Sequence, residues 1–201
     1  MSKPVPQRRV LVIGAGAPIG EALVRVLLDD DRVSHVLAAT GHPADSFPIE
    51  GREGLTVRSV DITRNRQLHH LLFDTAKGLN IDTVIHTAMH SSATDEGPRV
   101  HAYNVESVRN LMDHCERHPT IDRLVLRSAS AVYQVQRDLP VLIGEAHPLN
   151  MAGNAPQWVR DRVEADVSAC TRMGMGRLRI TVLRMAEVLS LIHISEPTRP
   201  D

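Results

Sequence analysis

A glycine-rich segment near the start of the chain has the residue types and spacing to hold a phosphate group. Gly14, Gly16 and Gly20 lie between the apolar run Arg9–Ile13 and an amphipathic stretch. A dinucleotide's pyrophosphate requires a tight turn, a bare backbone and the free amides of a helix N-terminus. Gly14 can supply the turn and Gly20 allows close helix–strand packing, although Ile19 stands where the G-x-G-x-x-G pattern has its third glycine. The segment therefore predicts a dinucleotide site, with a structural glycine turn as the alternative.

The residues that distinguish NAD from NADP are expected about twenty positions after the glycine-rich segment, where an acidic residue normally binds the adenosine ribose. Here the second apolar run ends in Thr40, Gly41 and His42, without an acid. Arg52 lies too far along the chain to be assigned to a 2′-phosphate. The cofactor is therefore predicted as NAD or NADP, and the choice between them stays open.

Short β-branched runs alternate with longer amphipathic stretches, and these elements must position the turn. The pattern predicts strands over residues 9–13, 35–39, 55–60, 82–87, 123–127 and 179–184. It predicts helices over residues 18–28, 66–77, 100–116 and 158–173, with Gly78 capping the second and Gly174 ending the last. The alternation implies an α/β fold, a Rossmann-type doubly wound parallel sheet with helices on both faces.

Composition excludes several classes of protein. The 201 residues suffice for one domain, and 42% hydrophobic with 23% charged residues is typical of a soluble globular chain. The net charge of −1 provides no basic field for nucleic acid. No apolar run approaches the roughly 18 residues of a membrane span, and the first residues are not a signal peptide. Cys115 and Cys170 lie far apart outside any C-x-x-C, which favours a reducing cytoplasm.

Eleven histidines raise the question of a metal site. His86 with His90, and His114 with His118, have the i, i+4 spacing of zinc ligands on helices. The first pair, however, ends a predicted strand, and the second ends a predicted helix, where histidine stabilises the helix dipole. We therefore expect no metal.

Five segments between residues 9 and 188 carry a further pattern in a fixed order. They are Gly14–Gly20, Val60–Ile62, Asp82–Ala88, Asn104–Leu111 and Arg123–Gln134. Together they resemble the extended short-chain dehydrogenase/reductase family, which contains NAD-dependent sugar epimerases and dehydratases. The resemblance implies a dinucleotide held by Gly14, Gly16, Ala17, Pro18, Ile19, Gly20, Asp61, Ile62, Thr87, Ala88, Asn104 and Arg162.

The same resemblance implies a catalytic Ser or Thr, a Tyr, and a Lys four residues after that Tyr. Alignment places Ala129, Trp158 and Arg162 at these positions, so all three are changed. The only tyrosines are Tyr103 and Tyr133, and no Y-x-x-x-K occurs in the chain. The catalytic residues are therefore unknown from the sequence.

Two replacements for the missing catalytic groups are considered: a serine beside Ala129, and Tyr133. Ser128 and Ser130 flank Ala129, but along a strand their side chains point to the opposite face unless the strand end bends. Tyr133 could transfer a proton from its own position. The simpler interpretation is that the serines cap backbone groups and that Tyr133 packs beneath a loop.

Two functions follow from these residues. The first is an NAD(P)-dependent enzyme of the epimerase/dehydratase type, with redox or epimerisation chemistry on a nucleotide-sugar-like small molecule. The second is a non-catalytic dinucleotide-binding sensor or scaffold, which the residues at the three changed positions favour. A homodimer is compatible with either function.

The last residues do not fit the resemblance. Residues 1–188 are predicted to form the NAD(P)-binding Rossmann domain. Residues 189–201 look like the translation of a sequencing-library adapter. The expectation is a truncated chain whose C-terminal substrate lobe is missing.

Overall fold

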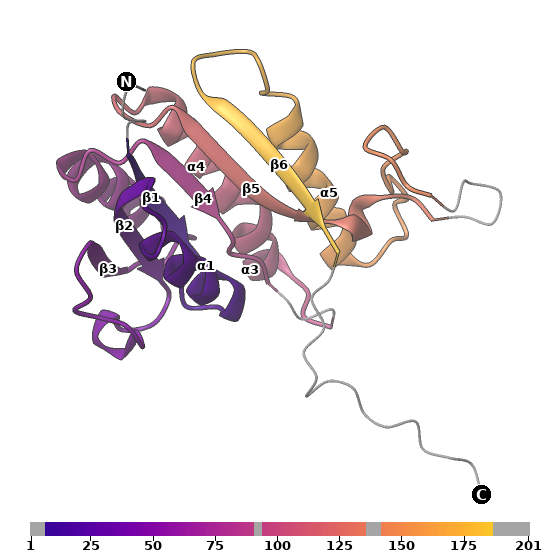
Figure 1. The fold of residues 1–201 in the computed structure, drawn as a ribbon. Coiled ribbons are helices and arrows are strands. Elements are labelled where there is room, and N and C mark those ends of the chain that lie inside the picture. Colours follow the sequence, from indigo (N-terminus) through magenta and orange to yellow (C-terminus); the bar gives the residue numbers. More distant parts are fainter. Residues whose placement is uncertain (1–6, 91–93, 136–141, 187–201) are drawn as a thin grey trace, which may run out of the picture.

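Six parallel strands form one sheet in the order β3-β2-β1-β4-β5-β6, with the first strand near the centre (Figure 1). The computed structural model describes residues 7–90, 94–135 and 142–186. The strands are β1 (Arg8–Ile13), β2 (Val33–Thr40), β3 (Leu55–Ser59), β4 (Thr83–His86), β5 (Arg123–Ala129) and β6 (Arg179–Met185). This is the strand order of the doubly wound dinucleotide-binding fold, so the predicted fold class is confirmed.

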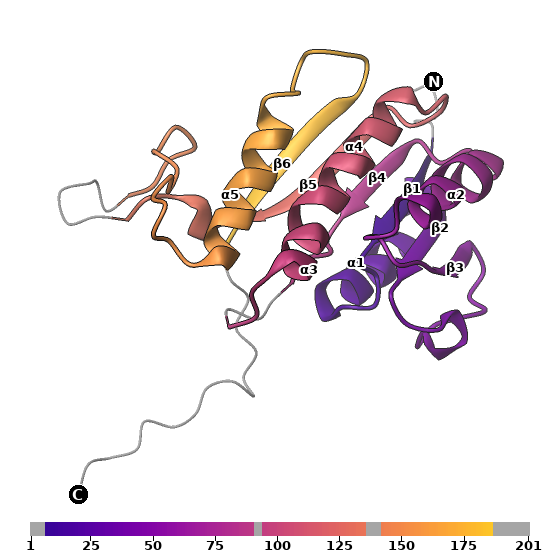
Figure 2. The ribbon, with the colours of Figure 1, turned by 180° about the vertical axis from the view of Figure 1, so that it is seen from behind.

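Helices cover both faces of the sheet. On one face lies α1 (Pro18–Leu28), and on the other lie α2 (Asn65–His70), α4 (Ser107–Arg117) and α5 (Gln157–Cys170). The face that carries α4 and α5 is turned toward the viewer in Figure 2. The remaining helical segments are α3 (Pro98–His101), the π-helices η2 (Leu71–Ala76) and η3 (Ala102–Glu106), and the 3-10 turns η1 (Ala44–Ser46) and η4 (Ser130–Val132).

The continuous apolar character of β1 reflects burial on both faces. Leu11 and Ile13 pack into the larger core cluster, beneath α2, α4 and α5. Val10 and Val12 pack into the smaller cluster, beneath α1. Alternate side chains of β1 thus pack against both helical layers. The strand ends at Ile13, where the glycine-rich turn begins.

The predicted helices differ from the observed ones in their interiors and ends. The predicted helix over residues 66–77 forms as α2 followed by the π-helix η2, and helical residues continue to Gly78, where the helix was predicted to stop. Gly78 is not the left-handed cap, because the positive φ of 51° belongs to Asn80, two positions later. The last helix ends at Cys170, and Gly174 follows with a φ of 74°.

Among the described residues, no helix is long and apolar enough to cross a membrane.

Candidate functional site

The glycine-rich turn links the end of β1 to the start of α1, at the carboxyl edge of the sheet. Gly14 has a φ of 87°, and the amides of Gly14 and Ala15 both donate to the Ala39 carbonyl, each over 3.0 Å. A Cβ atom added at Gly14 would lie 2.5 Å from the Ala88 nitrogen. Only glycine therefore fits here, because both the backbone angle and the close approach of the loop after β4 exclude a side chain.

Gly16 and Gly20 are also held in close contact with their surroundings. A Cβ atom at Gly16 would overlap the Thr40 hydroxyl, and one at Gly20 would overlap the Gly14 carbonyl oxygen. Ala17 precedes α1 in an extended conformation, and Pro18 is the first helical residue. No side chain of the described residues caps this helix start, so its first amides stay available to an anion.

A cleft of about 240 Å³ opens between the turn and the ends of β2, β3 and β4. Four predicted cofactor residues line it: Gly14, Asp61, Ile62 and Ala88. The other lining residues are Ala39, Thr40, Gly41, Val60 and Tyr103. The structure thus brings the glycine turn and the predicted cofactor residues Asp61 and Ile62 to one cleft. The remaining turn residues, Gly16, Ala17, Pro18, Ile19 and Gly20, shape the start of α1 behind it.

Asp61 is ionised and well paired. Its Oδ1 accepts hydrogen bonds from the Thr63 hydroxyl over 2.6 Å and the Thr63 amide over 3.0 Å, and Arg64 Nε lies 3.1 Å from Oδ2. The hydrogen bond from the Thr63 hydroxyl lowers the pKa of Asp61 most, and the Thr63 amide and then the nearby Arg64 charge lower it further. The carboxylate therefore keeps a fixed position at the mouth of the cleft.

Tyr103 was not predicted as a site residue, although it immediately precedes the predicted Asn104. It lines the cleft opposite the glycine turn, and burial raises the pKa of its hydroxyl, with Asp61 adding to the effect. At the start of a long helix, its spacing in the sequence does not distinguish it from an aromatic residue of the core.

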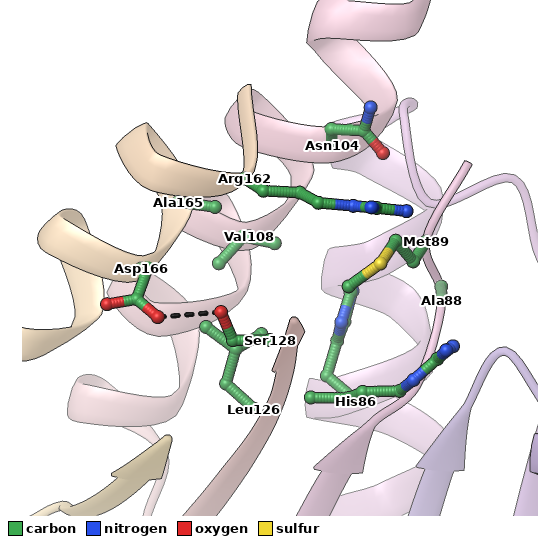
Figure 3. Close-up of a pocket in the computed structure, with 11 residues that line it drawn as sticks. His86, Ala88, Met89, Asn104, Val108, Leu126, Ser128, Arg162, Ala165 and Asp166 are labelled. Carbon is green, nitrogen blue, oxygen red and sulfur yellow. Dashed lines mark hydrogen bonds between the residues drawn. The ribbon is translucent and has the colours of Figure 1, made fainter. Parts of the chain in front are cut away.

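A second, smaller pocket adjoins the cleft, and Ala88 lines both. Figure 3 shows its walls, which come from the ends of β4 and β5 and from the helices η3, α4 and α5. Besides Ala88, two predicted cofactor residues lie here: Asn104, whose Oδ1 accepts the His90 amide over 3.0 Å, and buried Arg162. The guanidinium carbon of Arg162 lies 4.8 Å from the centre of the Trp158 ring. The two residues at the altered Tyr and Lys positions thus stack on each other.

Thr87 and His86 are neighbours at this edge of the sheet, and of their two side chains only that of Thr87 has a hydrogen-bond partner among the described residues. The Thr87 hydroxyl donates to the Ile13 carbonyl over 2.9 Å, which ties β4 to β1 and turns the hydroxyl into the sheet. His86 is only 2% exposed, and neither ring nitrogen has a hydrogen-bond partner among the described residues. Burial lowers the pKa of His86 to about 4, so the ring is neutral at pH 7.

A buried carboxylate on α5 engages one of the two serines that could replace the missing catalytic hydroxyl. Ser128 Oγ donates to Asp166 Oδ2 over 2.6 Å, the dashed line in Figure 3. Arg184 on β6 holds the same carboxylate in a bidentate pair, over 2.7 Å and 3.0 Å. Ser128 therefore joins β5 to α5 and is not directed at the cleft. Ser130 lies in η4, half-buried, next to buried Ala129.

The other substitute, Tyr133, also lies away from the cleft. Its hydroxyl accepts a hydrogen bond from Arg184 Nη1 over 3.0 Å, and its ring packs with Val132, Ala155 and Val159. Tyr133 lines neither the cleft nor the pocket beside it. Of the three candidate groups, Ser130 alone keeps a hydroxyl that no described residue binds.

The histidine pairs have individual roles in the fold. His114 Nε2 lies 2.7 Å from Asn65 Oδ1, and His118 Nε2 lies 2.9 Å from the Leu72 carbonyl oxygen. Within residues 7–90, 94–135 and 142–186, no three His, Cys, Asp or Glu side chains gather where they could hold a metal ion.

Comparison with known proteins agrees with this geometry. The model of the "NAD dependent epimerase/dehydratase family" matches residues 10–159. No curated protein matches the chain in sequence.

Solved structures of low sequence identity share the fold. A short-chain dehydrogenase/reductase superfamily protein from Agrobacterium tumefaciens with bound NAD is 22% identical, with a TM-score of 0.68 over 88% of this chain and 48% of its own. A dTDP-glucose 4,6-dehydratase from Bacillus anthracis in complex with NAD is 20% identical, with a TM-score of 0.71 over 88% and 54%. A UDP-N-acetylglucosamine 4-epimerase from Methanobrevibacter ruminantium is 21% identical, with a TM-score of 0.70 over 89% and 55%. The chain thus spans about half the length of these proteins.

Proposed function

Since the chain belongs to the NAD dependent epimerase/dehydratase family, we propose that it binds NAD or NADP in the cleft beside the glycine-rich turn. The observation that carries this proposal is the turn itself. A Cβ atom at Gly14, Gly16 or Gly20 would collide with the loop after β4, the end of β2 or the turn's own backbone. The absence of these three side chains leaves the bare backbone and open helix start that a pyrophosphate requires.

The chain's own residues would hold the dinucleotide along the carboxyl edge of the sheet. The turn and the first amides of α1 face the pyrophosphate, and Asp61 with Ile62 takes the adenine end. Asn104 and Arg162 lie at the small adjoining pocket, from whose wall the Arg162 charge would reach the nicotinamide ribose, with Ala88 between the two ends. When bound, the dinucleotide supplies hydride transfer.

We propose further that the whole protein acts on a nucleotide-sugar-like small molecule. The related structures support this substrate class, because one is a dTDP-glucose 4,6-dehydratase and another is a UDP-N-acetylglucosamine 4-epimerase with bound UDP-N-acetylmuramic acid. A homodimer and a cytoplasmic location are part of the same proposal.

A specific observation favours a second function, that of a non-catalytic dinucleotide sensor or scaffold. Ala129 has no hydroxyl, and neither the Trp158 indole nor the Arg162 guanidinium exchanges a proton near pH 7. Trp158 and Arg162 stack on each other, and Ala129 and Arg162 are buried. The two functions differ in turnover and not in cofactor binding.

A binding measurement combined with a turnover measurement separates the two functions. NADH or NADPH is titrated by its own fluorescence, and hydride transfer is then followed with UDP- and dTDP-sugars. In the whole protein with its substrate lobe, turnover that falls in Ser130→Ala supports the enzyme, whereas saturable binding without turnover supports the sensor; the present chain tests cofactor binding alone. In the second case, restoring Ala129→Ser, Trp158→Tyr and Arg162→Lys together is expected to produce activity. Absence of binding to either dinucleotide contradicts both functions.

A further inference from the structure

The first turn of α5 carries Trp158 and Arg162, and no side chain of the described residues caps it. Pro156 precedes the helix, and its carbonyl oxygen accepts the Val159 and Arg160 amides over 3.0 Å and 3.1 Å. A helix start without a capping side chain keeps unsatisfied amides and frays easily. Contacts from another element are therefore needed to hold Trp158 and Arg162 in place.

Those contacts come from the start of α3. Gln157 Oε1 accepts the Gly97 amide over 2.8 Å, and Gln157 Nε2 donates to the Gly97 carbonyl oxygen over 3.0 Å. Gly97 has a φ of 109°, in the left-handed region that favours glycine. The amide side chain of Gln157 thus satisfies both backbone polar groups of the residue that precedes α3.

A buried carboxyl group completes the contact between the two helices. The Asp161 side chain is only 4% exposed, and its Oδ1 lies 2.8 Å from His101 Nδ1 on α3. Its Oδ2 accepts a hydrogen bond from Gln157 Nε2 over 3.3 Å. Burial of a carboxyl group is costly unless its oxygens are hydrogen-bonded, so each of these contacts supports the others. We call Gly97, His101, Gln157 and Asp161 together the α3–α5 clamp.

The clamp joins two helical segments that each carry a residue of the pocket beside the cleft. On one side, α3 continues directly into η3, which carries Asn104. On the other side, Arg162 follows Asp161 in α5 and stacks on Trp158. Asn104 and Arg162 line the same pocket (Figure 3), whereas none of the four clamp residues lines the pocket or the cleft. The clamp can therefore act on a bound molecule only through the residues that it holds.

From this arrangement we propose that the α3–α5 clamp positions Trp158 and Arg162 at the nicotinamide end of the bound dinucleotide. The inference rests on the proposed function, because it concerns the same cofactor. Gln157, Asp161 and His101 are positioning residues, and their effect is confined to the nicotinamide half. The adenosine half lies at the glycine-rich turn and Asp61, which the clamp does not contact.

The experiment compares NADH with ADP, which lacks the nicotinamide half. Gln157→Met removes the hydrogen bonds of the Gln157 amide at a half-buried position and keeps an unbranched side chain. The Kd of NADH is measured by its own fluorescence and that of ADP by competition. The variant is expected to bind NADH about tenfold more weakly and ADP as tightly as the wild-type chain. Without cofactor, the emission of Trp158, the single tryptophan, is expected to shift to longer wavelength as the ring becomes more exposed to water.

The matched control is Arg109→Met. Arg109 joins α4 to α5 through hydrogen bonds to Glu164 over 2.8 Å and to Ser168 over 3.3 Å, so the control breaks a similar contact further along the same helix. It is expected to leave both Kd values and the Trp158 emission unchanged.

A second pair of variants tests the buried carboxyl group. Asp161→Ala should show the same selective loss of NADH affinity, and Asp161→Asn, which can still bond to Gln157 and His101, should recover most of it. Unchanged NADH affinity in Gln157→Met and Asp161→Ala, or equal weakening of NADH and ADP, overturns the inference and leaves the proposed function intact. A wild-type chain that binds neither NADH nor ADP contradicts the proposed function, and the inference falls with it.

Discussion

Acidification from pH 7 to pH 5 is expected to destabilise the folded chain through His86. Burial lowers the pKa of His86 from 6.5 to about 4, so the unfolded chain takes up a proton in this range and the folded chain does not. The stability that depends on a neutral His86 is complete above pH 6.5 and is lost as the pH falls toward 4. At pH 5 the loss relative to pH 7 amounts to roughly 2 kcal/mol, from about 1.4 kcal/mol per pKa unit.

Urea unfolding at pH 7 and at pH 5 measures this loss, and His86→Leu isolates the contribution of the one residue. The variant removes a buried, titrating imidazole whose ring nitrogens have no hydrogen-bond partner among the described residues. His35, His114 and His118 also have lowered pKa values, mainly through burial, and remain in both proteins as an internal control. The parent chain should lose about 2 kcal/mol more than the variant between the two pH values. The same pH dependence in both proteins would refute the reasoning.

Three further substitutions test separate contacts. Gly20→Ala places a methyl group on the Gly14 carbonyl oxygen and should cost about 2 kcal/mol in urea unfolding and weaken NADH binding; unchanged affinity would contradict the account of the turn. Arg184→Met leaves the fully buried Asp166 carboxylate without its bidentate partner and should lower the free energy of unfolding by about 3 kcal/mol, whereas a loss below 1 kcal/mol would show that the pair is not buried in solution. Tyr133→Phe removes one hydrogen bond to Arg184, worth about 1 kcal/mol, and should leave NADH affinity unchanged; a large loss of affinity would place this phenol at the cofactor.

The fold was predictable because its signals are local and repeated. The apolar run Arg9–Ile13 indicated a strand buried on both faces, and the spacing over residues 18–28 predicted α1 with its observed bounds. The second helix ends at Gly78 as its glycine predicted, but the left-handed residue that follows was not predictable from that glycine, because Asn80 adopts this conformation. The two π-helical segments, η2 and η3, also leave no sequence signature in hydrophobic spacing.

The site was predictable where one strand end or one turn defines it, and unpredictable where distant elements meet. Gly14, Asp61 and Ala88 each directly follow a predicted strand, and they line one cleft. The contact between Ser128 and Asp166 joins β5 to α5 across 38 positions, and no spacing rule links those residues. The isolation of His86 from hydrogen-bond partners is likewise a property of packing and not of sequence.

The central claim is that a nicotinamide dinucleotide binds at the glycine-rich turn. Amide chemical shifts of the isotope-labelled chain, followed by two-dimensional NMR during addition of NADH and then NADPH, test it directly. Binding at the turn predicts saturable shifts concentrated at Gly14, Gly16, Thr40, Gly41 and Ile62, the residues of the turn and the adjoining cleft. Saturable shifts located elsewhere, or none at millimolar cofactor, would contradict it.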